Sequence, residues 1–345
     1  MLFSIDYDHG SEISLYLVPD TGGSVPSLRI VSDNVELMVL SSNEERPELV
    51  GAGRHSTGMC GFVLNEKTLP GITGMHSLDL IDVDTGISVY RRARPEFIRQ
   101  KIFRLETHLL PLWRIDDALK DRFQYWYRGI DRRGYETSQQ VFCIADLESA
   151  YISGRLFIKS VEYYLNTGFK SVAMFRDPYD ELAERLIILK NVTEKTKELL
   201  GPRDAMTFEP VMDYLAAEVP ELEEEPLRRM FKRGPQDVLA PLNNPLVRQL
   251  SCANPGEMPR KTALGESLLA LSAFEIVSLR SDAAHFSEAL GETLGLPGGA
   301  VPTMTEFGRV IELSKKLKAI PEVEAVLDYD MNIFEQTKHA FGSIA

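Results

Sequence analysis

An arginine that directly follows an apolar run is the first feature of this sequence that could do chemistry. Arg176 comes after residues 169–175, which favour a strand, and before Asp177-Pro178, which favours a helix start. A guanidinium fork can grip two oxygens of a phosphate or sulfate group, and the first turn of a helix offers free amides to an anion. The alternative is a structural ion pair of Arg176 with Asp177 or Asp180. The pattern therefore predicts an anion site or a structural arginine at this turn.

A second candidate anion site is the turn at residues 146–155. We expect a strand over 140–145 and a helix over 147–165, which would place Ser149, Ser153 and Arg155 where a strand ends. Open parallel sheets bind ligands beyond the carboxyl ends of their strands, so these side chains could donate to an anion. The turn is not glycine-rich and contains no GxxxxGK[ST] element, so an ordinary capped turn is the alternative.

The segment from residue 91 to residue 133 carries twelve basic and six acidic side chains in a chain whose formal net charge is −13. It predicts either a solvated helical linker, with a helix over 116–127, or a basic wall that faces an anionic ligand. Glu106 and His108 lie in this segment. Either could serve as a general base toward a sugar hydroxyl, because each can accept a proton within hydrogen-bond reach. The alternative is that neither has a catalytic role.

The elements around these residues change character along the chain. Short strands are expected at 14–18, 27–32, 35–40, 78–83 and 87–90, the last two as a hairpin. The glycine-rich loop 51–58 reads as a turn of this β region, since no helix follows it. Residues 140–145, 169–175 and 274–279 then alternate with helices, and 282–294, 305–317 and 323–341 are helical. Alternating strands and helices favour parallel pairing with right-handed crossovers.

The predicted fold class is therefore α/β. An N-terminal all-β, sandwich-like domain (1–92) precedes a basic helical linker (93–138) and an α/β domain (139–345) with a mostly parallel sheet and a helical C-terminus.

Composition excludes several other classes of protein. The 345 residues are 44% hydrophobic and 26% charged, which is ordinary for a globular chain. No apolar run approaches the ~18 residues of a membrane helix, and the start of the chain lacks signal-peptide features. The net charge argues against nucleic acid as a partner. Three separated cysteines favour the reducing cytoplasm, and the dispersed histidines predict no metal site.

Parts of the chain resemble a known family. Residues 169–187, with their strand-Arg-Asp-Pro-Tyr-Asp-helix order, are similar to the 3′-phosphate-binding segment of sulfotransferases that use phosphoadenosine phosphosulfate (PAPS). Residues 274–290 resemble a late strand and helix of that family, and 328–334 the start of its last helix. The resemblance spans about 140–345. It implies transfer of a sulfuryl group from PAPS to a carbohydrate or small-molecule acceptor.

The resemblance also implies roles for the candidate residues. Arg176 would contact the 3′-phosphate, Ser153 and Arg155 would lie near the phosphosulfate with Ser149 as a further donor, and His108 or Glu106 would be the base.

The sequence departs from the family at two positions, which keeps other functions open. Ser153-Gly154-Arg155 replaces the family's basic residue before Gly-Thr/Ser, and Glu184 stands where a serine is expected. The alternatives are a glycosyltransferase that uses a nucleotide sugar and a non-catalytic glycan-binding or assembly protein.

Overall fold

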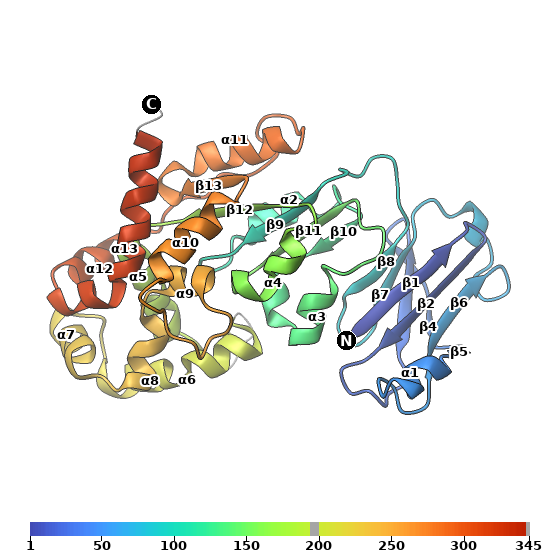
Figure 1. Cartoon of the computed structure of the whole chain (residues 1–345), viewed down its shortest axis with the longest axis horizontal. Coiled ribbons are helices and arrows are strands. Elements are labelled where there is room, and N and C mark those ends of the chain that lie inside the picture. Colours follow the sequence, from blue (N-terminus) through green and yellow to red (C-terminus); the bar gives the residue numbers. More distant parts are fainter. Residues whose placement is uncertain (194–199, 343–345) are drawn as a thin grey trace. The chain divides into compact units, whose positions relative to one another are not determined.

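The computed structural model describes residues 1–193 and 200–342, which form two compact units. The first unit consists of Met1–Lys101 and Leu119–Ile152, and the second of Ile102–Ala118 and Ser153–Ala345. Figure 1 shows antiparallel β sheets at the start of the chain, a parallel sheet with helices after them, and a helical C-terminus, so the predicted fold class is confirmed. The predicted domain ranges stay a prediction.

The first unit contains two four-stranded antiparallel sheets. One has the order β1-β2-β6-β5, built from β1 (Leu2–Asp8), β2 (Glu12–Val18), β6 (Met59–Asn65) and β5 (Glu44–Glu45). The other has the order β4-β3-β7-β8, built from β4 (Val35–Ser41), β3 (Ser27–Ser32), β7 (Asp79–Asp82) and β8 (Ser88–Arg91). Leu28 and Ile30 alternate with more exposed residues in β3, which buries one face of that sheet. The predicted hairpin is β7 paired with β8.

The glycine-rich loop 51–58 is a structural part of the first unit, as predicted. It follows the short helix α1 (Pro47–Gly51) and surrounds the buried side chain of His55. The Nδ1 of His55 accepts a hydrogen bond from the amide of Gly58 at 2.9 Å, and its Nε2 lies 3.1 Å from the carbonyl oxygen of Ser24. The ring thus ties the loop to its neighbours and leaves neither ring nitrogen for a ligand.

The parallel sheet has five strands in the order β10-β11-β9-β12-β13. They are β10 (Tyr125–Tyr127), β11 (Ala150–Gly154), β9 (Lys101–Leu105), β12 (Phe169–Phe175) and β13 (Ile276–Leu279). The last residues of β12 and β13 pair with each other, Phe175 opposite Leu279. Arg176 and Arg280 therefore leave two adjacent strands at the same level.

Three predicted elements near the candidate residues are wrong. Residues 140–145 form the end of α3 (Tyr135–Gln140) and a turn instead of a strand. The helix expected over 147–165 is β11 followed by α4 (Ile158–Leu165). The helix expected over 116–127 is α2 (Trp113–Ala118) followed by β10. All five residues of β11 are buried, so the strand shows no alternation, and its apolar residues merge with those of the next helix.

Helices make up most of the second unit after β12. They are α5 (Pro178–Lys190), α6 (Gly201–Glu218), α7 (Glu224–Arg233), α8 (Gln236–Leu239), α9 (Pro245–Ser251), α10 (Ala263–Ser272), α11 (Ala283–Thr293), α12 (Gly308–Lys318) and α13 (Pro321–Gly342). Short 3₁₀ turns are η1 (Ile72–Gly74), η2 (Ile130–Arg132), η4 (Ala240–Leu242) and η5 (Arg280–Asp282).

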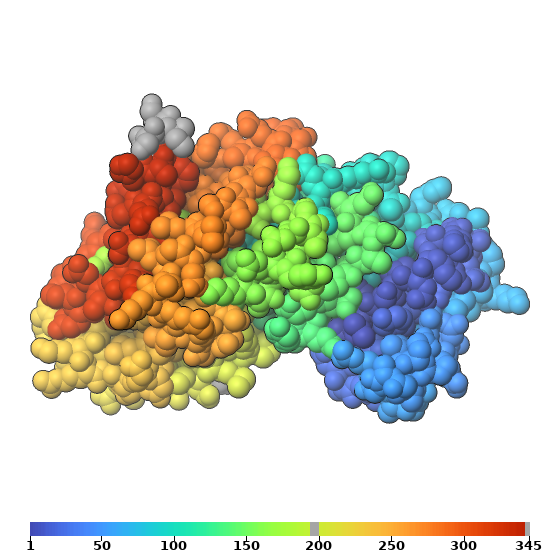
Figure 2. Space-filling model, viewed as in Figure 1, coloured from blue at the N-terminus to red at the C-terminus, as the bar shows by residue number. Residues whose placement is uncertain are grey.

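One apolar core joins α5, α6, α7, α12 and α13. In the space-filling view of Figure 2, the residues coloured yellow, orange and red form most of the visible surface of this unit. Within 1–193 and 200–342, none of the helices combines the length and apolar character that a membrane crossing needs.

Candidate functional site

Buried arginines follow the carboxyl ends of three parallel strands. Arg155 follows β11, Arg176 follows β12 and Arg280 follows β13, and each is at most 5% exposed. A fourth buried arginine, Arg104, lies within β9. This edge of a parallel sheet is where ligands usually bind. A buried guanidinium must also be paired, so the partners of each arginine decide what it can do.

Arg176 is held by two carboxylates, one from the following helix and one from a segment that is distant in sequence. Its Nη1 donates to Oε2 of Glu184 at 2.9 Å, and its Nη2 lies 3.4 Å from Oε2 of Glu306. Its Nε and Nη2 have no hydrogen-bond acceptor among the residues that the structure describes. The alternative pairing with Asp177 or Asp180 is not observed. Asp177 instead accepts from the amide of Tyr179 as the N-cap of α5.

Arg280 shares the Glu306 carboxylate with Arg176. Its Nε lies 3.2 Å from Oε1 of Glu306, and its Nη2 donates to the carbonyl oxygen of Thr305 at 3.1 Å. Its Nε and Nη1 have no hydrogen-bond acceptor within the described part of the chain. Burial lowers the pKa of Arg280, and the positive charge of Arg176 lowers it further. Two like charges therefore lie close together at this edge of the sheet.

Glu106 and His108 form a buried pair after β9. Oε1 of Glu106 lies 3.1 Å from Nδ1 of His108, and the same carboxylate accepts from Arg104 and from the amide of Leu112. Burial alone would raise the pKa of Glu106, but Arg104 and His108 hold it well below its usual range. Because Glu106 stays ionised, it fixes the ring proton on Nδ1.

In the neutral form of the ring, a proton held on Nδ1 leaves Nε2 of His108 as the acceptor. His108 is fully buried, and its Nε2 has no hydrogen-bond partner among the described residues. Of the two candidate bases, His108 is therefore the one that can accept a proton, at Nε2, and Glu106 orients the imidazole ring.

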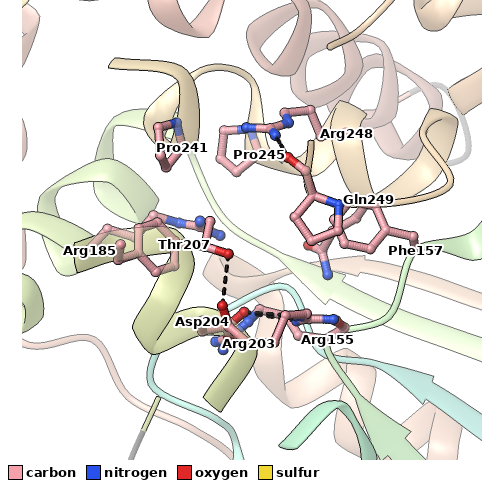
Figure 3. Close-up of a pocket in the computed structure, with 12 residues that line it drawn as sticks. Arg155, Phe157, Arg185, Arg203, Asp204, Thr207, Pro241, Pro245, Arg248 and Gln249 are labelled. Carbon is pink, nitrogen blue, oxygen red and sulfur yellow. Dashed lines mark hydrogen bonds and ion pairs between the residues drawn. The ribbon is translucent and has the colours of Figure 1, made fainter. Parts of the chain in front are cut away.

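Arg155 positions the backbone of the His108 loop. Its Nη1 donates to the carbonyl oxygens of His108 and Leu109 at 3.0 and 3.1 Å, and its guanidinium pairs with Asp204. Figure 3 shows Arg155, Arg203 and Asp204 together on one wall of a cavity of about 60 Å³, with Arg248, Pro241 and Pro245 on the opposite wall. Sites for drug-sized ligands have volumes of about 300–1,000 Å³, so this cavity cannot hold a nucleotide as it stands.

The two candidate serines have other surroundings. Ser149 belongs to the first unit, where its hydroxyl accepts from the amide of Gln124 at 3.0 Å. Ser153 is buried within β11, in the second unit, and precedes Arg155 by two residues. The structure thus brings Glu106, His108 and Arg155 into one hydrogen-bonded group. The roles of Ser149 and Ser153 as donors to a ligand stay predictions.

Three arginines of the basic segment form ion pairs with acids of their own unit. Arg91 pairs with Asp79 at 2.7 Å and Arg92 with Asp8 at 2.8 Å, both within the first unit. Arg104 pairs with Asp116 in the second unit. These three arginines are neutralised by acids of their own unit, which argues against a single basic wall that faces a ligand.

Sequence reasoning missed two members of the site. Arg280 had a usable signal, because it follows a predicted strand as Arg176 does. Glu306 had none, since it lies 130 positions from Arg176 in an irregular segment. No group of three or more His, Cys, Asp or Glu side chains in 1–193 and 200–342 could hold a metal ion.

Asp330 holds the helix that carries Arg248 and Gln249 of the cavity wall. Its carboxylate accepts from the amides of Leu246 and Val247 at 3.0 and 2.8 Å, at the start of α9. Burial raises the pKa of Asp330 to about 7, although these two amides oppose the rise. The folded protein therefore keeps a proton on Asp330 from about pH 4, where the unfolded chain releases it, up to about pH 7.

We expect the free energy of unfolding to fall as pH rises through this window, because the folded state binds the extra proton. Asp330 should contribute about 4 kcal/mol to that fall, from about 1.4 kcal/mol for each pH unit. Urea titrations at pH 5 and pH 7.5 should detect about 3 kcal/mol of this fall, because about two pH units of the window lie between them. Asp330→Asn should flatten the pH dependence, while Glu335→Gln, an exposed change on the same helix, should leave it unchanged. Equal slopes in all three proteins would contradict this assignment.

No protein-family model matches this chain, and no curated protein is similar enough in sequence to count as a match. The resemblance to PAPS-dependent sulfotransferases therefore stays a prediction, and the function has to be argued from the site.

Proposed function

We propose that this protein transfers a sulfuryl group from PAPS to a hydroxyl of a carbohydrate or other small-molecule acceptor. The observation that carries the proposal is the pair Arg176 and Arg280. These buried guanidiniums leave adjacent parallel strands and have N–H groups without acceptors among the described residues. Such a pair suits a doubly charged phosphate or sulfate group, whose oxygens can accept from both forks.

The residues of the site have the following roles in this proposal. Arg176 and Arg280 bind a phosphate group of the donor and place its sulfur in line with the acceptor hydroxyl. The hydroxyl oxygen attacks sulfur, the bond from sulfur to the bridging phosphate oxygen breaks, and adenosine 3′,5′-bisphosphate leaves. Nε2 of His108 takes the hydroxyl proton while Glu106 holds Nδ1–H. Positioning and charge stabilisation supply most of the rate, so few groups are needed. His108 is fully buried, so the site must open for this reaction.

The pairing of Arg155 with Asp204 favours a second candidate, a non-catalytic protein that binds glycans or assembles with others. Arg155 was expected near the phosphosulfate, but its guanidinium already contacts Asp204 and two carbonyl oxygens.

A cytoplasmic location remains part of the first proposal, supported by the separated free thiols of Cys60, Cys143 and Cys252.

We expect adenosine 3′,5′-bisphosphate to bind the wild-type protein and Arg176→Lys to weaken that binding by about 1.5–3 kcal/mol, the range for a hydrogen bond to a charged group. Lysine keeps the charge beside Glu184 and Glu306 but loses the fork. Isothermal titration calorimetry measures both affinities. Arg229→Lys changes an exposed arginine of the same unit and should have no effect.

The same titrations separate the proposed functions. Uridine diphosphate that binds more tightly than adenosine 3′,5′-bisphosphate would favour the glycosyltransferase. Absence of binding by either nucleotide would overturn the enzymatic proposal and favour the non-catalytic one. Equal affinity of wild type and Arg176→Lys would remove Arg176 from the donor site.

A further inference from the structure

The carboxylate of Glu306 lies where the two strand-end arginines would hold an anion. Oε1 lies 3.2 Å from Nε of Arg280 and Oε2 lies 3.4 Å from Nη2 of Arg176. Glu306 comes from residues 302–307, which have no regular secondary structure and connect the region after α11 to the start of α12. Its side chain is 25% exposed, whereas those of both arginines are 2% exposed. Glu306 is therefore the member of this ion-pair group that contacts solvent, while both arginines are buried behind it.

The carboxylate neutralises the arginines without satisfying them. Nε and Nη2 of Arg176 and Nε and Nη1 of Arg280 have no hydrogen-bond acceptor among the described residues, and Oε2 of Glu306 has no donor. A planar carboxylate has only two oxygens for the two guanidinium groups of Arg176 and Arg280, which follow different strands. A tetrahedral phosphate or sulfate group offers three or more, so it can accept from both forks at once. The site is thus better matched to a ligand than to Glu306.

The segment that carries Glu306 has no regular secondary structure and lies between two glycines. Its contacts outside the ion pairs include the carbonyl oxygen of Thr305 with Arg280 and that of Pro302 with Ser287. Gly299, at a φ of +79°, precedes the segment, and Gly308 follows it with open space beside its Cα. Glu184, the other carboxylate at Arg176, differs because it is buried within α5 and receives a 2.9 Å hydrogen bond.

We propose that Glu306 is an internal competitor that fills the anion position while the site is empty, and that the phosphate or sulfate group of a ligand displaces it. This inference rests on the proposed function, because it assumes that Arg176 and Arg280 bind the donor. In the empty protein Glu306 offsets the cost of two unpaired buried charges. When the ligand binds, Glu306 and its segment move toward solvent, and the ligand takes over their counter-charge.

The test compares Glu306→Gln with the wild-type protein by calorimetry, using sodium sulfate, inorganic phosphate and adenosine 3′,5′-bisphosphate as separate ligands. If Glu306 occupies the position 90–99% of the time, its removal should tighten binding about 10- to 100-fold. Glu312→Gln, an exposed change on α12, is the matched control and should bind like wild type. Higher affinity of Glu306→Gln for all three ligands supports a site that binds the tetrahedral anion itself. A gain for the nucleotide alone also supports displacement, with the nucleoside contributing.

The outcomes distinguish this inference from the proposed function. Wild-type binding of the nucleotide with no gain in Glu306→Gln would overturn the competitor and leave the proposed function standing. No binding of any ligand to either protein would overturn both. Limited proteolysis after the exposed Phe307 gives an independent measurement. Saturating ligand should speed cleavage of wild type there, and an unchanged or slower cleavage rate would contradict displacement.

Discussion

Replacement of His108 by asparagine is expected to lower the rate of sulfuryl transfer by about 10²–10⁴-fold, the usual contribution of a general base. Asparagine can keep the hydrogen bond that Nδ1 makes with Glu106 but has no atom at the position of Nε2. The variant should therefore bind adenosine 3′,5′-bisphosphate as wild type does and fail in the proton transfer. Glu106→Gln should also slow transfer, because glutamine can present the wrong atom to Nδ1 and lose the ring orientation.

The measurement is release of adenosine 3′,5′-bisphosphate from PAPS in the presence of a panel of monosaccharide and oligosaccharide acceptors. His285→Asn, an exposed substitution on α11, is the control for a general effect of losing a histidine. A His108→Asn enzyme with wild-type turnover would show that His108 is not the base. A variant that loses nucleotide affinity together with turnover would show that His108 acts on binding instead.

Replacement of Arg104 by methionine is expected to lower the free energy of unfolding by about 3–5 kcal/mol. Arg104 is 2% exposed and makes a two-pronged contact with Asp116, its Nη2 donating at 2.9 and 3.0 Å. Its Nη1 also donates to Glu106 at 3.0 Å. Methionine fills a similar length but leaves two buried carboxylates without their shared cation. That uncompensated burial accounts for the size of the loss.

The two tryptophans allow this loss to be measured in the unit that contains Arg104. Trp113 lies in the second unit and Trp126 in the first, so a Trp126→Phe background leaves a fluorescent reporter of the second unit alone. Arg228→Met is the matched control. Arg228 also pairs with two carboxylates, Glu224 and Glu225, but is 35% exposed, and such surface pairs contribute about 0–1 kcal/mol. Similar losses in the two variants would mean that burial does not set the cost.

β3 and β12 were predicted with the bounds that the structure shows, whereas β9 and β11 were missed. β3 has the predicted bounds, because Leu28 and Ile30 alternate with less buried residues and a glycine turn precedes the strand. The residues of β11 are all buried, so the strand has no period of two and its apolar residues read as part of a helix. β9 was missed because Lys101 and Arg104 gave it the charge of a linker. Arg104 is compatible with a buried strand only because Asp116 folds back onto it.

The candidate site was predictable only in its local part. The sequence pattern predicted that Arg176 lies between a strand and a helix. The two-residue spacing of Glu106 and His108 also placed these two residues close together. The partners of Arg176 could not be read. Glu184 is eight residues away along α5 and looked like an obstacle to an anion, and Glu306 is reached only through the folded chain. Long-range ion pairs have no local sequence signal, because the chain between the partners sets their distance.

The strand-end arginines have a consequence for how this protein can be stabilised. Well-packed apolar side chains that replace a buried ion network of similar volume are often neutral or stabilising by about 1–4 kcal/mol. Selection for heat resistance alone would therefore tend to replace Arg176, Glu184, Arg280 and Glu306 together by apolar residues. Such a protein would keep the parallel sheet and its helices while losing the N–H groups that we propose bind an anion. If this charged edge of the sheet binds the proposed anion, stability and ligand binding oppose each other there, and engineering for stability alone would remove the binding site.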